Sequence, residues 1–131
     1  MKVLALDYGA ARTGVAVSDA TGTLATPLEV VERASSKAGL ARIGDLVDAH
    51  GVELVVVGLP LTLRGERGAQ VVETETFVSA LAMTLGVPVE TYDERFTTAL
   101  AARGSGVQPE DARAAAYLLE SYLAWKSAQT T

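Results

Sequence analysis

The first half of the chain consists of apolar runs separated by short polar breaks. The segments KVLALDYG (2–9) and VELVVVGLP (52–60) are apolar at consecutive positions, which is typical of central strands covered on both faces. RTGVAVSD (12–19) follows the first run after a short connection, so the two are expected to form a hairpin. TLATPLEVVER (23–33) predicts a third strand, with Pro27 at an irregular start or an edge position.

Residues 35–51 have the apolar spacing of a helix. Ser35 or Ser36 can cap its N-terminus, and Gly51 can end it. The chain's one histidine, His50, then falls in the last helical turn, where an imidazole is common and needs no metal. A helix at this point separates the first and second fully apolar runs, so these two strands are expected to be parallel.

The second half continues with alternating elements. A glycine- and arginine-containing loop, 61–70, precedes a helix that ends before Gly86, and residues 87–96 predict a short strand. Residues 97–106 begin like a helix and break at two glycines. Residues 107–126 predict the last helix, with Pro109 suited to its first turn.

The resulting order is βββαβαβα, which indicates an α/β protein built around one sheet. The 131 residues fit a single domain, expected over 1–126, with 127–131 as a frayed tail. No repeat, linker or low-complexity tract interrupts it.

The composition narrows the class of protein that this chain can belong to. The chain lacks cysteine, has no run of 18 apolar residues and opens directly on a strand, so we expect a cytoplasmic protein without a membrane span. Its net charge of −5 argues weakly against nucleic-acid binding, which needs lysine and arginine for phosphates. Because charge can be local, the placement of the eleven basic residues decides this point.

Carboxylates fall where predicted elements begin or end. Asp7 ends the first strand, Asp93 and Glu94 end the last strand, and Asp111 opens the last helix. The helical stripe of Asp111 continues at i+4, i+7 and i+11 with side chains that should face the core: Ala115, Leu118 and Tyr122.

Carboxylates gathered at one site repel one another unless a divalent cation neutralises them, and oxygen ligands suit Mg²⁺ or Mn²⁺. Such clusters support metal-assisted phosphodiester hydrolysis. Each residue also has an ordinary interpretation, since Asp7 can simply form a turn and Asp111 can serve the helix dipole. Gly9 and Gly14 can be hairpin glycines with positive φ.

Four blocks together resemble the YqgF/RuvX family of Holliday junction resolvases and pre-16S rRNA processing nucleases. They are LALDYGAARTGVAVSD, VVVGLPL, VETYDERFTT and DARAAAYLLESYL, in that order along nearly the whole chain. The resemblance implies an RNase H-like fold, in which a five-stranded mixed sheet with its first three strands antiparallel is flanked by helices.

The resemblance also implies a metal-dependent nuclease. It places catalytic and metal-binding roles on Asp7, Asp93 and Asp111, with Glu94 as an additional candidate and Mg²⁺ or Mn²⁺ as the cofactor. The candidate phosphate contacts near these carboxylates are Arg12, Arg64, Arg67 and Arg95, and the hydroxyls that follow the DER block are Thr97 and Thr98. Gly58, Leu59 and Pro60 would shape a strand end.

One region departs from the family. The loop before the last helix is short here and contains only Arg103 as a basic residue, where relatives usually have a longer, basic loop. The resemblance implies that the partner is nucleic acid, either a DNA junction or an rRNA precursor. The short loop leaves the affinity for this partner and the geometry of the substrate open.

Two other classes remain open at this point. A non-catalytic binding module in transcription or ribosome assembly would fit the acidic surface. An actin- or sugar-kinase-like nucleotide-binding domain fits the Asp-x-Gly hairpin, although 131 residues supply only one of its two lobes.

A junction resolvase would be a homodimer, because its substrate has two equivalent strands to cut.

Overall fold

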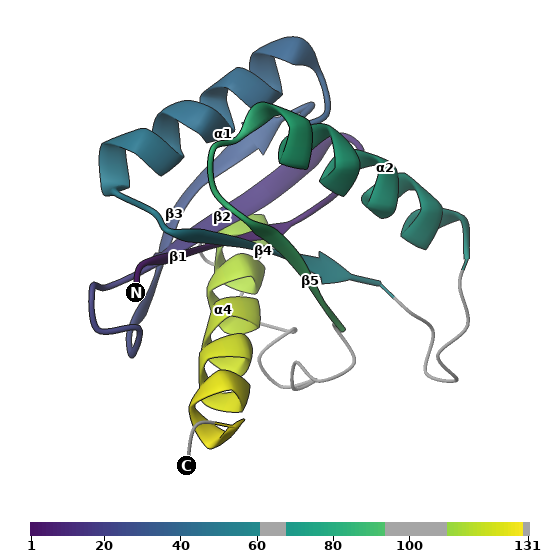
Figure 1. Cartoon of the computed structure of the whole chain (residues 1–131). Coiled ribbons are helices and arrows are strands. Elements are labelled where there is room, and N and C mark those ends of the chain that lie inside the picture. The colour runs from purple at the N-terminus through teal and green to yellow at the C-terminus, as the bar shows by residue number, and fades with distance from the viewer. Residues whose placement is uncertain (61–67, 94–109, 130–131) are drawn as a thin grey trace.

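The computed structural model describes residues 1–60, 68–93 and 110–129, and the side chains of Glu110 and Asp111 are outside that description. The described part is a mixed five-stranded sheet with helices on both faces (Figure 1). Several predicted site residues therefore lie outside the described residues: Arg64, Arg67, Glu94, Arg95, Thr97 and Thr98. The expected helix at 97–106 lies outside them as well.

The sheet has the strand order β3-β2-β1-β4-β5. Its strands are β1 (Val3–Asp7), β2 (Arg12–Ser18), β3 (Ala25–Glu32), β4 (Leu54–Leu59) and β5 (Val89–Asp93). The first three pair antiparallel, while β4 pairs parallel with both β1 and β5. The expected hairpin, the parallel pairing of the two apolar runs and the order βββαβαβα are all confirmed.

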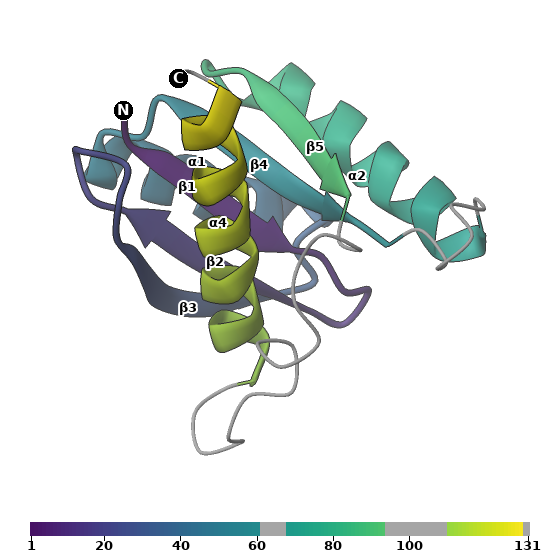
Figure 2. The same ribbon diagram turned by 90° about the horizontal axis from the view of Figure 1, so that it is seen from below.

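Helices α1 (Lys37–His50) and α2 (Ala69–Thr84) cover one face of the sheet, and α4 (Glu110–Gln129) crosses the other (Figure 2). Ser36 is the N-cap of α1, since its hydroxyl accepts a hydrogen bond from the Gly39 amide, and Gly51 ends the helix in a left-handed conformation.

Each face of the sheet has its own apolar core, as strand alternation requires. Under α1 and α2, Leu4 and Leu6 of β1 pack with Ile43 and Phe77. Under α4, Val3 and Ala5 of the same strand pack with the α4 side chains: Ala115, Ala116, Leu118, Leu119 and Tyr122. The side on which a strand residue stands can therefore be read from its position in the alternation.

Two details concern the expected boundaries. Helix α4 continues to Gln129, so residues 127–129 of the expected tail are helical. No glycine or proline interrupts Ser-Ala-Gln, and the helix continues through it. Pro27 does lie on an edge strand, where β3 pairs irregularly with β2 near Val15 and Ala16.

Candidate functional site

Three parallel strands bring the predicted carboxylates to one edge of the sheet. Strands β1, β4 and β5 end there at Asp7, Leu59 and Asp93. Because β2 is antiparallel to β1 and to β3, β2 begins and β3 ends at the same edge, at Arg12 and Glu32. We call this the carboxyl edge.

Asp7 is half-buried at the end of β1. It alternates with Val3 and Ala5, so it belongs to the sheet face that α4 covers. Its cross-strand partner is Gly14 of β2, so β2 places no side chain beside the carboxylate at this level.

The connection from β1 to β2 is tightly fixed. The Gly9 amide and carbonyl both contact the hydroxyl of buried Thr13, at 3.3 Å each. Gly9 does not adopt the positive φ that a hairpin glycine can have, but a Cβ there would collide with the Arg12 carbonyl oxygen. The ring of Tyr8 stacks on Phe77 of α2 with centroids 4.4 Å apart. Asp7 is thus followed by a rigid stretch of chain.

Asp93 lies on the same edge but two strands away. It is level with Leu59 of β4, whereas Leu6, just before Asp7, is level with Val57. Two strand spacings separate the backbones of β1 and β5 by about 10 Å. Asp93 also alternates with Tyr92, whose ring packs under α4, so Asp93 belongs to the opposite face from Asp7.

The helical stripe that contains Asp111 faces the sheet, as expected from its spacing. Ala115, Leu118 and Tyr122 are at most 1% exposed. Asp111 lies in the first turn of α4 on this stripe, and its side chain is outside the described residues. The described residues alone contain no group of three or more His, Cys, Asp or Glu side chains that could hold a metal ion.

Basic groups gather at the carboxyl edge beyond those expected from sequence. Arg12 is exposed and has Glu32 as its cross-strand neighbour. Arg33 and Lys37, both exposed, follow the end of β3 and open α1, so the N-terminus of α1 adds its partial positive charge. Sequence reasoning missed Arg33 and Lys37. The signal was the antiparallel pairing of the third strand, which must end where the first strand ends.

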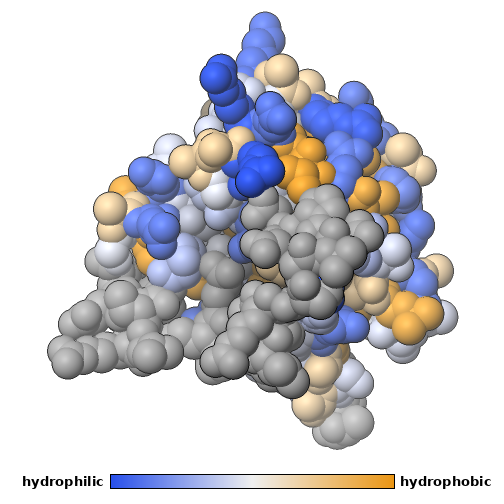
Figure 3. All heavy atoms as spheres, turned by 180° about the vertical axis from the view of Figure 1, so that it is seen from behind, coloured by the Kyte–Doolittle hydropathy of each residue, from blue (hydrophilic) through white to orange (hydrophobic). Residues whose placement is uncertain are grey.

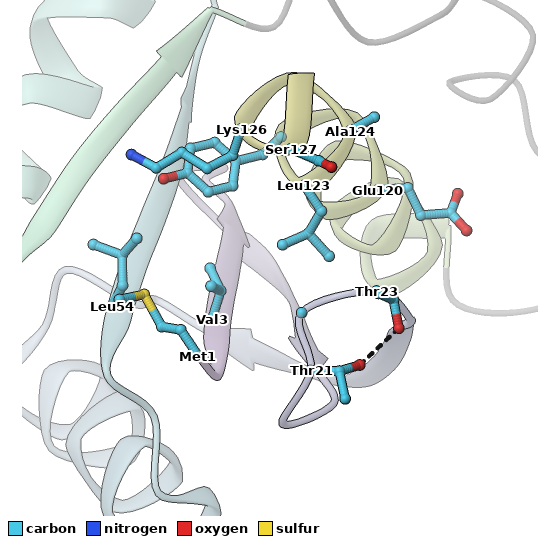
Figure 4. Close-up of a pocket in the computed structure, with 12 residues that line it drawn as sticks. Met1, Val3, Thr21, Thr23, Leu54, Glu120, Leu123, Ala124, Lys126 and Ser127 are labelled. Atoms are coloured by element: carbon cyan, nitrogen blue, oxygen red, sulfur yellow. Dashed lines mark hydrogen bonds between the residues drawn. The ribbon is translucent and has the colours of Figure 1, made fainter. Parts of the chain in front are cut away.

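A hollow of about 620 Å³ lies at the opposite edge of the sheet (Figure 4). Val3 and Leu54, the first residues of β1 and β4, form part of its wall, and Leu123 and Lys126 of α4 contribute too. Its position, where the parallel strands begin, separates it from Asp7 and Asp93. It is therefore distinct from the candidate site.

Asp19 shows a carboxylate used only for structure. In the β2–β3 loop, the Thr21 hydroxyl and the amides of Leu24 and Thr23 donate to it and hold the pKa of its carboxyl well below its usual range. All of these partners belong to one loop, so the perturbed pKa reflects a fixed turn.

Comparison with solved structures gives the class of fold. The RuvC of Thermus thermophilus, in a complex with a Holliday junction substrate, superposes with a TM-score of 0.69. The match covers 99% of this chain and 97% of that chain at 20% identity. The Fowlpox virus resolvase, in a complex with Holliday junction DNA, gives a TM-score of 0.50 at 8% identity, covering 99% and 98% of the two chains. The chain has the RNase H-like fold of RuvC.

Sequence comparison gives the family. The model of the RuvX family, described as a Holliday junction resolvase, matches residues 1–125, and the chain belongs to this family. A Chloroflexus aggregans protein named "Putative pre-16S rRNA nuclease" is 43% identical over 130 residues, covering 92% of each chain. A protein of the same name from Desulforudis audaxviator is 48% identical over 99 residues, covering 76% of this chain and 70% of the relative. The resemblance seen in the four sequence blocks is confirmed.

None of the helices in the described part of the chain is both long and apolar enough to cross a membrane. On the face drawn in Figure 3, the visible apolar areas are bordered by hydrophilic residues.

Proposed function

We propose that this chain is a divalent-metal-dependent nuclease that cleaves structured nucleic acid, with the precursor of 16S rRNA as its substrate. The observation that carries the proposal is the carboxyl edge, where an RNase H-like sheet gathers the ends of β1 and β5. The family and the names of its relatives support hydrolysis of phosphodiester bonds.

The proposed metal ligands are Asp7, Asp111 and one carboxylate of the Asp93–Glu94 pair. Their donor set is all oxygen, which fits Mg²⁺ or Mn²⁺. Asp7 and the Asp111 stripe belong to the same face of the sheet, whereas Asp93 alternates to the other. This difference favours Glu94 as the third ligand.

When bound, a divalent cation neutralises the carboxylates, activates water and stabilises the leaving oxygen. The chain's own part is to fix the ligands and to hold the backbone of the substrate. The rigid stretch after Asp7 fixes that carboxylate. We assign phosphate contacts to Arg12, Arg33 and Lys37, and the predicted contacts outside the described residues remain part of the proposal: Arg64, Arg67, Arg95, Thr97 and Thr98.

A cleavage panel tests this function. The protein is incubated with an RNA that spans the 5′ end of 16S rRNA and its precursor sequence, with a four-way DNA junction, and with duplex and single-stranded DNA. Each substrate is tested with Mg²⁺, Mn²⁺ and EDTA. We expect cleavage of the precursor RNA that depends on the cation and is abolished by EDTA.

Two other results have clear meanings. Preferential cleavage of the four-way junction would replace the RNA assignment with a junction resolvase. Tight binding of any of these substrates without cleavage under either cation would contradict the nuclease and favour a binding module.

A further inference from the structure

Strand β5 and helix α4 carry the candidate carboxylates other than Asp7. Polar contacts of two tyrosine hydroxyls join these two elements. The Tyr122 hydroxyl in α4 donates to a Glu90 carboxylate oxygen of β5 at 3.0 Å. The Tyr92 hydroxyl of β5 lies 2.8 Å from the Ser121 hydroxyl of α4. We call these two contacts the tyrosine clamp.

Aromatic packing reinforces the clamp. The rings of Tyr92 and Tyr122 meet edge to face with centroids 5.5 Å apart, and Trp125 packs on both at 5.7 and 5.9 Å. Tyr92 and Tyr122 are 6% and 1% exposed, whereas Glu90 is exposed, so both contacts are partly buried. A hydrogen bond between partly buried groups has a preferred direction and contributes to stability.

The rest of α4 packs differently. The helix lies mainly against β1, β2 and β3. In its first two turns the buried contacts are made by alanines, Ala112, Ala115 and Ala116, and two buried leucines follow, Leu118 and Leu119. Methyl groups give close packing but no directional bond, so they resist lifting of the helix more than they resist sliding or pivoting. The tyrosine clamp supplies direction at the other half of α4.

Asp111 lies eleven residues before Tyr122, about 16 Å along the helix axis at the rise of an α-helix. A small pivot of α4 at the clamp therefore becomes a large displacement at its first turn. On β5 the clamp acts still closer to a candidate ligand, because Tyr92 directly precedes Asp93.

We propose that Tyr92 and Tyr122 are positioning residues, which set the first turn of α4 relative to the end of β5 and so fix the distance between their carboxylates. This rests on the proposed function only for its metal-binding consequence. The positional effect on α4 is a property of the metal-free fold.

The test uses Tyr92→Phe and Tyr122→Phe, which keep both rings and remove only the hydroxyls. Tyr117→Phe is the matched control, because the Tyr117 hydroxyl accepts a hydrogen bond from Arg113, which also belongs to α4. The first measurement is hydrogen–deuterium exchange of the α4 amides 112–116 in metal-free protein. The second is the Mn²⁺ midpoint, the free Mn²⁺ concentration at which binding of the ion is half-saturated.

We expect faster exchange at 112–116 in both clamp variants than in wild type. We also expect their Mn²⁺ midpoint to rise by roughly two- to tenfold, the range that the net free energy of one hydrogen bond corresponds to. Tyr117→Phe should keep the wild-type Mn²⁺ midpoint. Only a positioning role moves the midpoint without removing any carboxylate.

Wild-type exchange at 112–116 in both clamp variants would overturn the inference, whatever the metal does. Faster exchange with an unchanged midpoint would overturn its link to the carboxylates. If wild type itself shows no binding of Mn²⁺, the metal site of the proposed function fails, and the exchange measurement alone still decides whether the clamp positions α4.

Discussion

Gly9 shows how a single residue fixes the surroundings of the site. From the sequence, a positive φ was one possible reason for a glycine here, but the structure gives another, because a side chain would collide with the Arg12 carbonyl oxygen. Such a close approach depends on how the turn folds back on itself, which the sequence does not show. Asp7 could be placed from sequence because an apolar run ends there, and its half-buried position at the end of β1 agrees.

The face on which Asp93 stands could not be read from the sequence. In VETYD, polar residues occupy both faces of β5, since Glu90 contacts Tyr122 while Thr91 is exposed. Because apolar and polar residues do not alternate regularly in this strand, the sequence does not show which residues face the core. The packing of Tyr92 under α4 and of Val89 on the other face assigns the faces.

The assignment of faces predicts different effects for two neighbouring carboxylates. Glu94→Gln should lower Mn²⁺-dependent cleavage by several orders of magnitude, because it removes a proposed ligand. Asp93→Asn should lower it by less, at most roughly ten- to a hundredfold, the range for a residue that supports a ligand without binding the metal. Cleavage rates of the two variants at saturating Mn²⁺ measure the difference. The reverse order would return the ligand role to Asp93.

At the scale of elements, the contact between α4 and β5 is the part that the sequence predicted least. Apolar runs and helical spacing identified the strands and the core stripe of α4. They could not show that Tyr122 and Glu90, 32 residues apart, would bond. A tyrosine in an apolar stripe signals burial, and its hydroxyl partner depends on how the helix crosses the sheet.

This bond predicts a pH dependence at the alkaline end. Burial, together with the hydrogen bond to Glu90, raises the pKa of Tyr122 from 10.0 to about 12. The unfolded chain therefore loses the phenol proton first, and the stabilisation is complete below pH 10 and lost as pH rises to about 12. Relative to Tyr122→Phe, wild type should lose on the order of 1 kcal/mol over this window, allowing for solvent screening.

Denaturant unfolding of both proteins between about pH 9 and 12 measures that loss as a difference, which removes the titration of groups common to both. A difference that stays constant across the window would mean that the Tyr122 hydroxyl is not preferentially kept neutral in the fold.

At the scale of the molecule, the proposed binding of a polyanion has to be reconciled with an acidic chain. The net charge is −5, yet the antiparallel return of β3 brings Arg33 and Lys37 to the edge where Asp7 lies. Net charge describes the whole surface, whereas phosphate contacts depend on one edge. The sequence contained the basic residues, but their common location depended on strand pairing.

Removing both charges should weaken nucleic-acid binding and its dependence on salt. In Arg33→Ala with Lys37→Ala, the slope of log affinity against log salt should become shallower by roughly 0.7 to 0.9 for each phosphate that is no longer neutralised. The matched control is Lys2→Ala with Lys126→Ala, which removes two charges at the opposite end of the sheet. Equal slopes for the two double variants would exclude the carboxyl edge as the phosphate-binding surface.

The central claim is that cleavage takes place at the carboxyl edge, and Asp7 is the half-buried carboxylate that ends β1 there. The most direct measurement is the single-turnover rate of Mn²⁺-dependent cleavage by Asp7→Asn, beside Asp48→Asn, which removes an exposed carboxylate from α1. Both variants should fold, and the substrate is the one that wild type cleaves best. We predict a loss of orders of magnitude in Asp7→Asn and a rate close to wild type in Asp48→Asn. Wild-type cleavage by folded Asp7→Asn would contradict the account.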